Sequence, residues 1–155
     1  MGVSSNILYL ANELTAYSAV VLYKPMLGEV AYDTPTLPME LPTLRFMIQP
    51  DAHTDPFAVA LQCSEVCGGH KTFILIPGKH FDDSGTRHGH GGGWYDRFLT
   101  AIPQDWLRIG IANISQLSKT RHIRKSHDEP VDWIITFDGI SFGALKCEAR
   151  TKHKV

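Results

Sequence analysis

The sequence predicts an α/β domain in which a mostly parallel sheet is flanked by helices. Short apolar and β-branched runs recur along the chain, separated by loops or by stretches with helical patterning. The most continuous run, residues 72–76, is almost entirely apolar, which is typical of a strand covered on both faces. The length of 155 residues, 43% of them hydrophobic, suits one domain that buries its own core. We therefore expect residues 1–155 to form a single domain.

One helix and two strands are expected within residues 1–50. Apolar residues at helical spacing predict a helix over residues 7–14, capped by Ser5 or Asn6. The run 19–23 predicts a buried strand, and 44–49 predicts another.

The interval between these two strands is rich in proline. Proline fixes φ and removes a backbone donor, so the prolines between residues 30 and 50 exclude a long helix there. Residues 56–66 then predict a short helix or irregular turns, ended by Gly68 and Gly69.

The second half alternates more clearly between strands and helices. We expect a strand over residues 72–76, a helix over 94–101 that stops before Pro103, and a strand over 107–111. A helical turn over 115–119, a last strand over 133–137 and a frayed basic tail over 146–155 are expected to follow.

Charge and cysteine content restrict the class of protein. Lys and Arg number 15 against 16 Asp and Glu, so a nucleic-acid binder that relies on bulk positive charge is not expected. No apolar run approaches the ~18 residues of a membrane span, and the first residues carry no basic segment typical of a secretory signal. Three cysteines in a chain of this size do not indicate a disulfide framework. We expect a reduced, cytoplasmic protein that binds neither membranes nor nucleic acid.

The strongest functional signal is a glycine-rich segment before the predicted helix 94–101. Four glycines fall between residues 89 and 93, and backbone N–H groups without a neighbouring Cβ can approach an anion closely. The helix N-terminus behind them adds partial positive charge. Arg87 offers a fork suited to phosphate oxygens, and Asp96 offers a carboxylate to Mg²⁺. The order of these groups favours a phosphate-binding loop over a surface loop without a ligand, although it matches neither a Walker A loop nor a dinucleotide fingerprint.

This segment resembles a known family signature. Ile76-Pro77-Gly78-Lys79-His80-Phe81-Asp82, followed by Gly85, Arg87, Gly89 and Gly91-Gly92-Gly93-Trp94-Tyr95-Asp96-Arg97, is similar to the 5-formyltetrahydrofolate cyclo-ligase (5,10-methenyltetrahydrofolate synthetase) family. Two further segments agree in the same order, Tyr23-Lys24-Pro25-Met26-Leu27-Gly28-Glu29-Val30 and His127-Asp128-Glu129-Pro130-Val131-Asp132. The resemblance spans about residues 20–140 and implies a Rossmann-like sheet.

The resemblance also implies a reaction. Such ligases use Mg²⁺ and ATP to phosphorylate the formyl oxygen of 5-formyltetrahydrofolate. N10 then attacks the activated carbon, forming a C–N bond, and phosphate leaves to give 5,10-methenyltetrahydrofolate. The protein would position the reactants and stabilise charge.

Carried over residue by residue, the resemblance implies three groups of site residues. The ATP-binding group is Arg87, Gly89, His90, Gly91, Gly92, Gly93, Trp94 and Asp96, and the metal ligands are Asp96 and Asp128. The substrate-binding group is Tyr23, Glu29, Phe46, Trp94 and Tyr95. Glu29, Tyr95 and Arg87 would act in catalysis.

Structural roles compete with several of these assignments. Asp96 is also a carboxylate that favours a helix dipole, and Asp128 is also a turn residue before Pro130. Tyr23 and Phe46 lie in strand-like runs, where aromatic residues commonly belong to the core.

The chain also departs from the family pattern. No Lys or Arg precedes Lys24, whereas relatives begin with a long helix whose cations reach the ATP phosphates. His90 stands where many relatives have Arg, and residues 31–37 are too few for the crossover helix expected there. A shortened homologue that binds folate or nucleotide without efficient ligation is therefore the alternative to an active ligase.

Two further hypotheses come from other residues. Cys63, Cys67 and His70, with His53 or His80 as the fourth ligand, form an irregular and partial zinc pattern. In the tail, the four cations Lys146, Arg150, Lys152 and Lys154 either remain solvated or fold back over ATP.

Overall fold

A computed structural model describes residues 2–26, 28–32, 37–51, 53–88, 93–118 and 129–147, with the backbone alone for 2–5. Its main sheet has six strands in the order β2-β1-β3-β6-β8-β9. All neighbouring pairs are parallel except β8 and β9, which are antiparallel. The α/β class with a mostly parallel sheet is thus confirmed. The strands are β1 (Ala19–Tyr23), β2 (Leu44–Ile48), β3 (Thr72–Pro77), β6 (Leu107–Asn113), β8 (Trp133–Phe137) and β9 (Phe142–Lys146).

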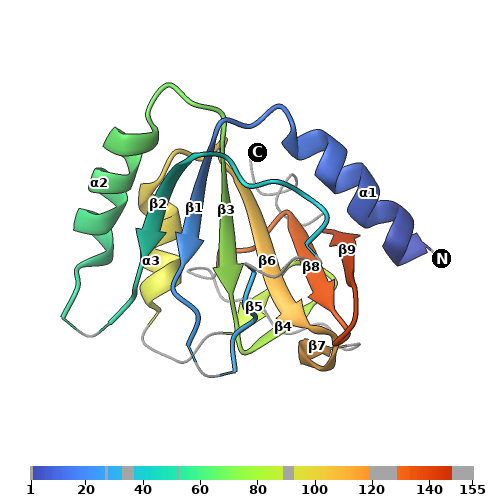
Figure 1. The fold of residues 1–155 in the computed structure, drawn as a ribbon. Coiled ribbons are helices and arrows are strands. Elements are labelled where there is room, and N and C mark those ends of the chain that lie inside the picture. The colour runs from blue at the N-terminus through green and yellow to red at the C-terminus, as the bar shows by residue number, and fades with distance from the viewer. Residues whose placement is uncertain are drawn as a thin grey trace.

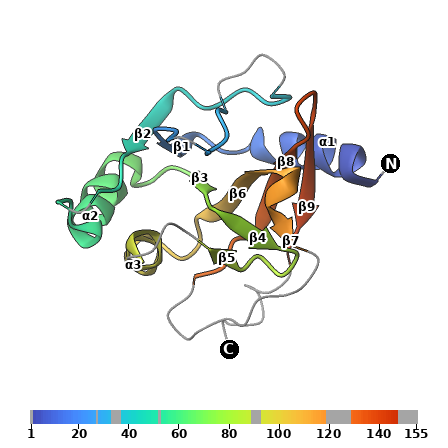
Figure 2. The same ribbon diagram turned by 90° about the horizontal axis from the view of Figure 1, so that it is seen from below.

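Helices cover both faces of this sheet. Helix α1 (Gly2–Leu14) packs on β9 on one face, whereas α2 (Pro56–Cys67) and α3 (Trp94–Ala101) pack on each other on the opposite face (Figures 1 and 2). A small second sheet, in the order β5-β4-β7, lies below the main one in Figure 1. Its strands are β4 (His80–Asp82), β5 (Arg87–His88) and β7 (Leu117–Ser118), and a 3-10 turn (Ile114–Gln116) precedes β7.

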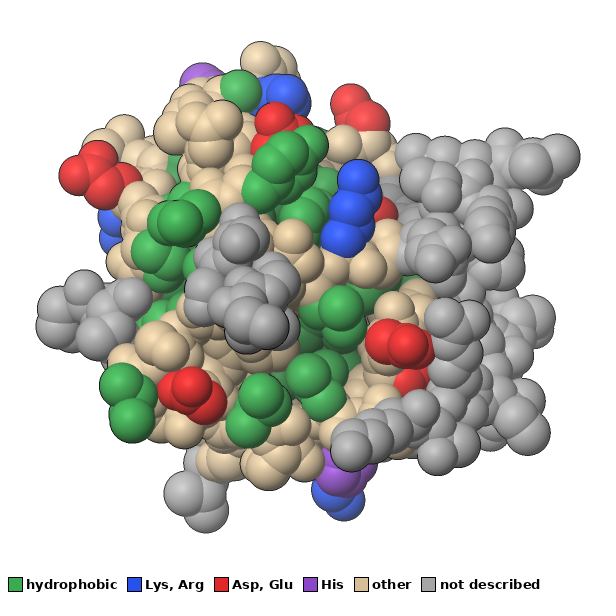
Figure 3. Space-filling view, turned by 90° about the vertical axis from the view of Figure 1, so that its right-hand side faces the viewer, with side chains coloured by type: hydrophobic (Ala, Val, Ile, Leu, Met, Phe, Trp, Pro, Cys, Tyr) green, Lys and Arg blue, Asp and Glu red, His purple; other side chains and the backbone are tan. Residues whose placement is uncertain are grey.

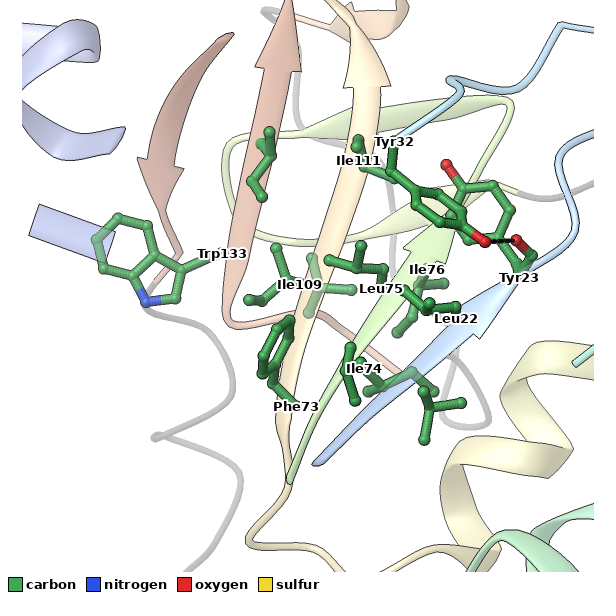
Figure 4. Packing of buried hydrophobic residues seen from close by; sticks show 14 of the residues in the cluster. Leu22, Tyr23, Tyr32, Phe73, Ile74, Leu75, Ile76, Ile109, Ile111 and Trp133 are labelled. Carbon is green, nitrogen blue, oxygen red and sulfur yellow. Dashed lines mark hydrogen bonds between the residues drawn. The ribbon is translucent and has the colours of Figure 1, made fainter. Parts of the chain in front are cut away.

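The core lies around the neighbouring strands β1 and β3, whose residues are all buried. Figure 4 shows side chains of β1, β3, β6 and β8 packed together, with Trp133 at the end nearest α1. Each fully buried Ile, Leu or Phe contributes about 1.5–3 kcal/mol of transfer free energy. Because both faces of these strands are covered, the apolar run 72–76 needs no polar alternation.

The predicted helix starts differ in accuracy. Helix α2 begins as predicted, because the Asp55 carboxylate accepts a hydrogen bond of 3.0 Å from the Phe57 N–H and Pro56 occupies the first turn. Helix α1 begins at Gly2, so neither Ser5 nor Asn6 is its cap, and that prediction is wrong. Once the buried face of α1 is anchored, extending the helix by further turns adds one hydrogen bond per residue.

The connection from β1 to β2 runs over residues 24–43, and its described stretches contain no helix. This agrees with the expected loss of a crossover helix. Two tyrosines hold the connection instead: the Tyr23 hydroxyl donates to the Val30 carbonyl, and the Tyr32 hydroxyl donates to the Tyr23 carbonyl (Figure 4).

The end of the chain also differs from the prediction. The strand 133–137 is not the last, because Asp138 starts a turn into β9 by accepting from the Ser141 N–H at 2.8 Å, and Gly139 has a φ of 98°. Lys146 therefore belongs to a strand, and Cys147 is buried with its N–H bonded to the Asp132 carbonyl at 2.8 Å. Arg150, Lys152 and Lys154 lie outside the described residues.

Apolar side chains are exposed on the face formed by α1 and the β8–β9 turn (Figure 3). Leu8 is 66% exposed and Ile140 is 81% exposed, while Tyr9 stacks on Trp133 with 6.1 Å between ring centroids. No helix in the part of the chain that the structure describes is long and apolar enough to cross a membrane.

Candidate functional site

The candidate site lies where the parallel strands β1, β3 and β6 end. Loops at the carboxyl ends of such strands form the ligand crevice of open α/β sheets. In Figure 1 these ends are at the lower edge of the sheet, near β4 and β5. Four of the predicted residues come together here: Tyr23 at the end of β1, Glu29 in the following loop, Arg87 in β5 and Tyr95 in the first turn of α3.

Tyr95 is the most unusual residue of this group. Its hydroxyl is buried and has no hydrogen-bond partner within the part of the chain that the structure describes. The Arg87 guanidinium lies over the ring, with 4.6 Å from its central carbon to the ring centroid. Burial raises the pKa of Tyr95, an effect that Arg87 opposes and Glu29 reinforces, so the hydroxyl stays protonated and can donate.

Arg87 is held in place by the tight hairpin of β4 and β5 and by a bond to the end of β3. Its Nε donates to the Pro77 carbonyl at 2.8 Å, at the end of β3. In the turn between β4 and β5, the buried Asp82 carboxylate accepts from the Ser84 N–H at 2.9 Å and the Thr86 N–H at 3.2 Å. The turn therefore fixes where β5 presents the guanidinium.

Glu29 is held by a turn of its own loop. Its carboxylate accepts from the Met26 N–H at 2.9 Å, and its N–H donates to the Met26 carbonyl at 2.9 Å. The charge of Glu29 raises the pKa of both Tyr23 and Tyr95, which places the carboxylate within electrostatic range of both rings. The turn thus fixes a half-buried carboxylate in the loop that follows β1.

Tyr23 has a structural role in addition to its predicted one. It is fully buried, burial raises its pKa, and its hydroxyl is used to hold the Val30 carbonyl. Tyr32, which the sequence reasoning missed, packs edge-on against it with 5.0 Å between ring centroids. Its signal in the sequence was a single aromatic residue in a proline-rich loop, two positions after Val30.

Gln116 is a second residue that the sequence reasoning missed. Its side-chain amide donates to the Gly28 carbonyl at 3.4 Å and to the Gly78 carbonyl at 3.3 Å. Its carbonyl oxygen accepts from the Asn113 N–H at 2.8 Å. One side chain thus joins the end of β6, the turn after β3 and the loop that carries Glu29. Nothing local marks this role, because all its partners are distant in sequence except Asn113.

Asp96 lies on α3 one turn from the glycine-rich segment. Its carboxylate accepts from the Glu129 N–H at 3.1 Å, which joins α3 to the segment before β8. Gly93 begins the helix with a left-handed φ of 64°. Gly89, His90, Gly91, Gly92 and Asp128 lie outside the described residues, so their roles stay predictions.

Trp94 and Phe46 lie at the margins of the site. The Trp94 indole N–H donates to the Thr54 hydroxyl at 3.1 Å, and its ring stacks on Phe98 at 5.4 Å. Phe46 is half-buried in the middle of β2, opposite Val21, and packs against the core. Their roles in substrate binding stay predictions.

The partial zinc pattern is not assembled in the part of the chain described. Cys63 and Cys67 are buried in α2, and burial raises the pKa of both thiols. His70 lies 3.0 Å from the Ser18 hydroxyl. Within the described ranges, no group of three or more His, Cys, Asp and Glu side chains is placed to hold a metal ion.

A separate hollow of about 580 Å³ lies at the opposite edge of the sheet, between the end of α1 and residues 38–43. Leu14, Tyr17 and Met39 contribute to its lining, and none of the predicted site residues does. The candidate site is therefore defined by Tyr23, Glu29, Arg87 and Tyr95 and not by the size of this hollow.

The fold and this edge define an open α/β protein with its site at the carboxyl ends of a parallel sheet. A model of the 5-formyltetrahydrofolate cyclo-ligase family matches residues 54–137, more than half of the chain. The chain belongs to this family.

Two relatives agree with this assignment. A 5-formyltetrahydrofolate cyclo-ligase of Saccharomyces cerevisiae is 35% identical over 72 residues, which cover 43% of this chain and 34% of the yeast protein. The chain thus spans about a third of the length of the curated relative that it matches. A solved structure of a 5,10-methenyltetrahydrofolate synthetase from Mycoplasma pneumoniae has a TM-score of 0.53 and 20% identity, covering 85% of this chain and 83% of that one. This likeness supports the fold.

Proposed function

We propose that the chain converts 5-formyltetrahydrofolate to 5,10-methenyltetrahydrofolate with ATP and Mg²⁺, as one cyclo-ligase-like domain over residues 1–155. The observation that carries the proposal is the buried Tyr95 hydroxyl, which has no hydrogen-bond partner among the described residues and whose ring lies against the Arg87 guanidinium. A buried hydroxyl without a partner costs about 1–3 kcal/mol, and an oxygen of a bound ligand would remove that cost.

The reaction joins two steps on one substrate. The formyl oxygen forms a bond to the γ-phosphorus of ATP as the bond from that phosphorus to ADP breaks. N10 then forms a bond to the formyl carbon and loses its proton, and phosphate leaves with the formyl oxygen. Negative charge is redistributed over oxygens in both steps, so fixed donors that meet those oxygens accelerate the reaction.

The residues of the site fit these tasks. Tyr95 is a neutral donor for the formyl oxygen, because burial raises its pKa. Arg87 is fixed by Pro77 and by the Tyr95 ring, so its cation is held beside the reacting group without loss of side-chain freedom on binding. Glu29, held by Met26, is placed to accept a hydrogen bond from the pterin end of the folate.

The phosphates of ATP would lie at the N-terminus of α3. The backbone N–H groups of the first turn after Gly93 and the helix dipole favour an anion there. The Asp96 carboxylate is half-buried in this turn and supplies the hard oxygen that Mg²⁺ prefers, so it fits the ion, with Asp128 as the second predicted ligand. The ion would neutralise charge on the phosphates.

The test is turnover by the purified protein. Incubation with 5-formyltetrahydrofolate, Mg²⁺ and ATP is expected to produce the absorbance of methenyltetrahydrofolate, and a reaction without ATP is the control. If no product exceeds that control at high enzyme concentration, ligation by this chain is refuted.

The second candidate function is a non-catalytic homologue that binds folate or nucleotide. It is favoured by two departures from the family pattern, because His90 stands where many relatives have Arg and residues 31–37 are too few for a crossover helix. Calorimetry with each ligand alone, after a negative turnover result, separates binding without ligation from no binding. In either case we infer a cytoplasmic protein whose partner is a small molecule, in agreement with its net charge of -1.

A further inference from the structure

Arg108 is a cation in the core. It lies in β6, is 1% exposed and is the largest of the fully buried side chains. The residues that follow it in the strand, 109–112, are all buried and apolar, as expected for a strand covered on both faces. Burying a cation costs several kcal/mol before its partners compensate, so stability alone does not favour arginine at this position.

The guanidinium joins the end of α3 to the segment before β8. One nitrogen donates to the Leu99 carbonyl at 2.9 Å and to the Gln104 side chain at 3.1 Å. The other donates to the Glu129 carboxylate at 2.9 Å and to the Pro130 carbonyl at 3.4 Å. The Leu99 carbonyl lies in the last turn of α3, where the helix dipole favours a positive charge such as that of Arg108.

Asp96 meets the same segment from the other end of α3. Its carboxylate accepts from the Glu129 N–H at 3.1 Å. Asp96 and Leu99 are three residues apart and so share one face of the helix. Glu129 is thus held through its side chain by Arg108 and through its backbone by the predicted metal ligand.

The rest of the segment is held equally firmly. The Arg108 N–H donates to the Asp132 carboxylate at 2.8 Å, and the Asp132 N–H donates to the Arg108 carbonyl at 2.8 Å. The Val131 N–H donates to the Gly85 carbonyl at 3.0 Å. A Cβ at Gly85 would come within 2.5 Å of the Val131 carbonyl oxygen, so this approach requires glycine.

We propose that Arg108 is a positioning residue that fixes residues 129–132 against α3, and through Glu129 orients the Asp96 carboxylate for Mg²⁺ bound with ATP. The proposal rests on the proposed function, because it assumes a nucleotide site at α3. It explains why a buried arginine occupies β6: the fork reaches a helix end, a side-chain amide and a carboxylate at once, which no apolar side chain does.

The experiment compares ATP binding with and without metal. Calorimetry gives the Kd of ATP in excess Mg²⁺ and in EDTA for the wild type, Arg108→Met, Arg108→Lys and Glu129→Gln. Removal of partners that orient metal ligands typically weakens metal affinity 10- to 100-fold. The preference for the metal complex is the Kd in EDTA divided by the Kd in Mg²⁺. Arg108→Met and Glu129→Gln are expected to reduce this ratio by about tenfold, because the Kd in Mg²⁺ rises while the Kd in EDTA is unchanged. Arg108→Lys, which keeps the charge but not the fork, is expected to recover part of the ratio.

A matched control separates positioning from general loss of stability. Leu10→Ala opens a cavity under α1, on the far face of the sheet, and is expected to lower stability without changing the ratio of Kd values. Glu129 is 21% exposed on its side chain, so Glu129→Gln carries the test if Arg108→Met does not fold.

The outcomes are distinct. If the wild type binds ATP more tightly with Mg²⁺ and the Arg108 and Glu129 variants keep that full preference, the positioning role is wrong and the proposed metal site stands. If the wild type binds ATP equally with and without Mg²⁺, the metal site is wrong and the role of Arg108 falls with it. A tenfold loss of the preference in both variants but not in Leu10→Ala confirms the proposal.

Discussion

Tyr95→Phe removes one buried atom, and the structure predicts opposite effects on stability and on activity. Without ligands, none of the described residues hydrogen-bonds the hydroxyl, which costs about 1–3 kcal/mol relative to its solvated state. The substitution keeps the ring that packs under Arg87. We therefore expect the free energy of unfolding to rise by about 1 kcal/mol, which for a chain of this length raises Tm by roughly 2–4 °C.

The effect on turnover has the other sign. If Tyr95 donates to the formyl oxygen as charge develops on it, the lost bond is worth about 1.5–3 kcal/mol. That corresponds to a decrease in kcat/KM of about 10- to 150-fold. The decrease should appear mainly in kcat, because the interaction strengthens in the transition state.

Tyr23→Phe is the matched control, since it removes the same atom from a neighbouring ring. The Tyr23 hydroxyl donates to the Val30 carbonyl, so its loss breaks a buried hydrogen bond. This variant is expected to lower the free energy of unfolding by about 1–3 kcal/mol. The two tyrosines should therefore shift stability in opposite directions.

Thermal unfolding without ligands and the methenyltetrahydrofolate absorbance assay measure the two effects. The reasoning is refuted if Tyr95→Phe destabilises the protein as much as Tyr23→Phe does and turns over at the wild-type rate. In that case the Tyr95 hydroxyl would have a partner in solution and no part in the reaction.

Three further predictions concern the frame of the site. Gly110→Ala should lower stability by about 1–3 kcal/mol in denaturant unfolding, because its Cβ would lie 2.6 Å from the Phe81 ring, and an unchanged midpoint would contradict this packing. Gln116→Leu should raise KM for the folate more than it lowers kcat, by freeing the loop at Gly28; an equal KM would show that the amide does not hold the loop. The free energy of unfolding should fall as pH rises above about 10, because burial raises the pKa of Tyr23 and Tyr95 in the folded state while tyrosines of the unfolded chain ionise near 10. The slope should be at most about 1.4 kcal/mol per pH unit for each tyrosine, and it should decrease in Tyr95→Phe. A slope identical to that of the wild type would contradict the burial of Tyr95.

Much of the fold follows from local patterns in the sequence. Short apolar runs predicted β1, β3, β6 and β8, and residues 56–66, which were expected to form a short helix or irregular turns, lie in α2. The short strands β4, β5 and β7 were not predicted, since two or three residues carry no periodicity. Strand β9 was missed although Asp138-Gly139 is a hairpin signal between two apolar runs; the dipeptide was interpreted as the end of the last strand.

The candidate site was predictable only in part. Tyr23, Glu29, Arg87 and Tyr95 come together because each follows or begins an element whose end lies at the same edge of the sheet. The contributions of Tyr32, Gln116 and Arg108 depend on partners far away in the chain, so a linear pattern does not reveal them. The resemblance to a family supplied roles for several residues but none for Arg108. The role inferred for Arg108 comes from its contact with Glu129, whose N–H donates to Asp96 of α3.

The order of the strands also has a consequence for how the site is completed. Residues 72–147 supply β3 to β9 together with α3, so Arg87 and Tyr95 come from one continuous part of the chain. Glu29 and Tyr23 come from the part before β2, which reaches this edge only when β1 pairs with β3. The site thus combines two parts of the chain, and we expect local opening of the earlier part to abolish turnover while amides of β6 and β8 remain protected from hydrogen exchange.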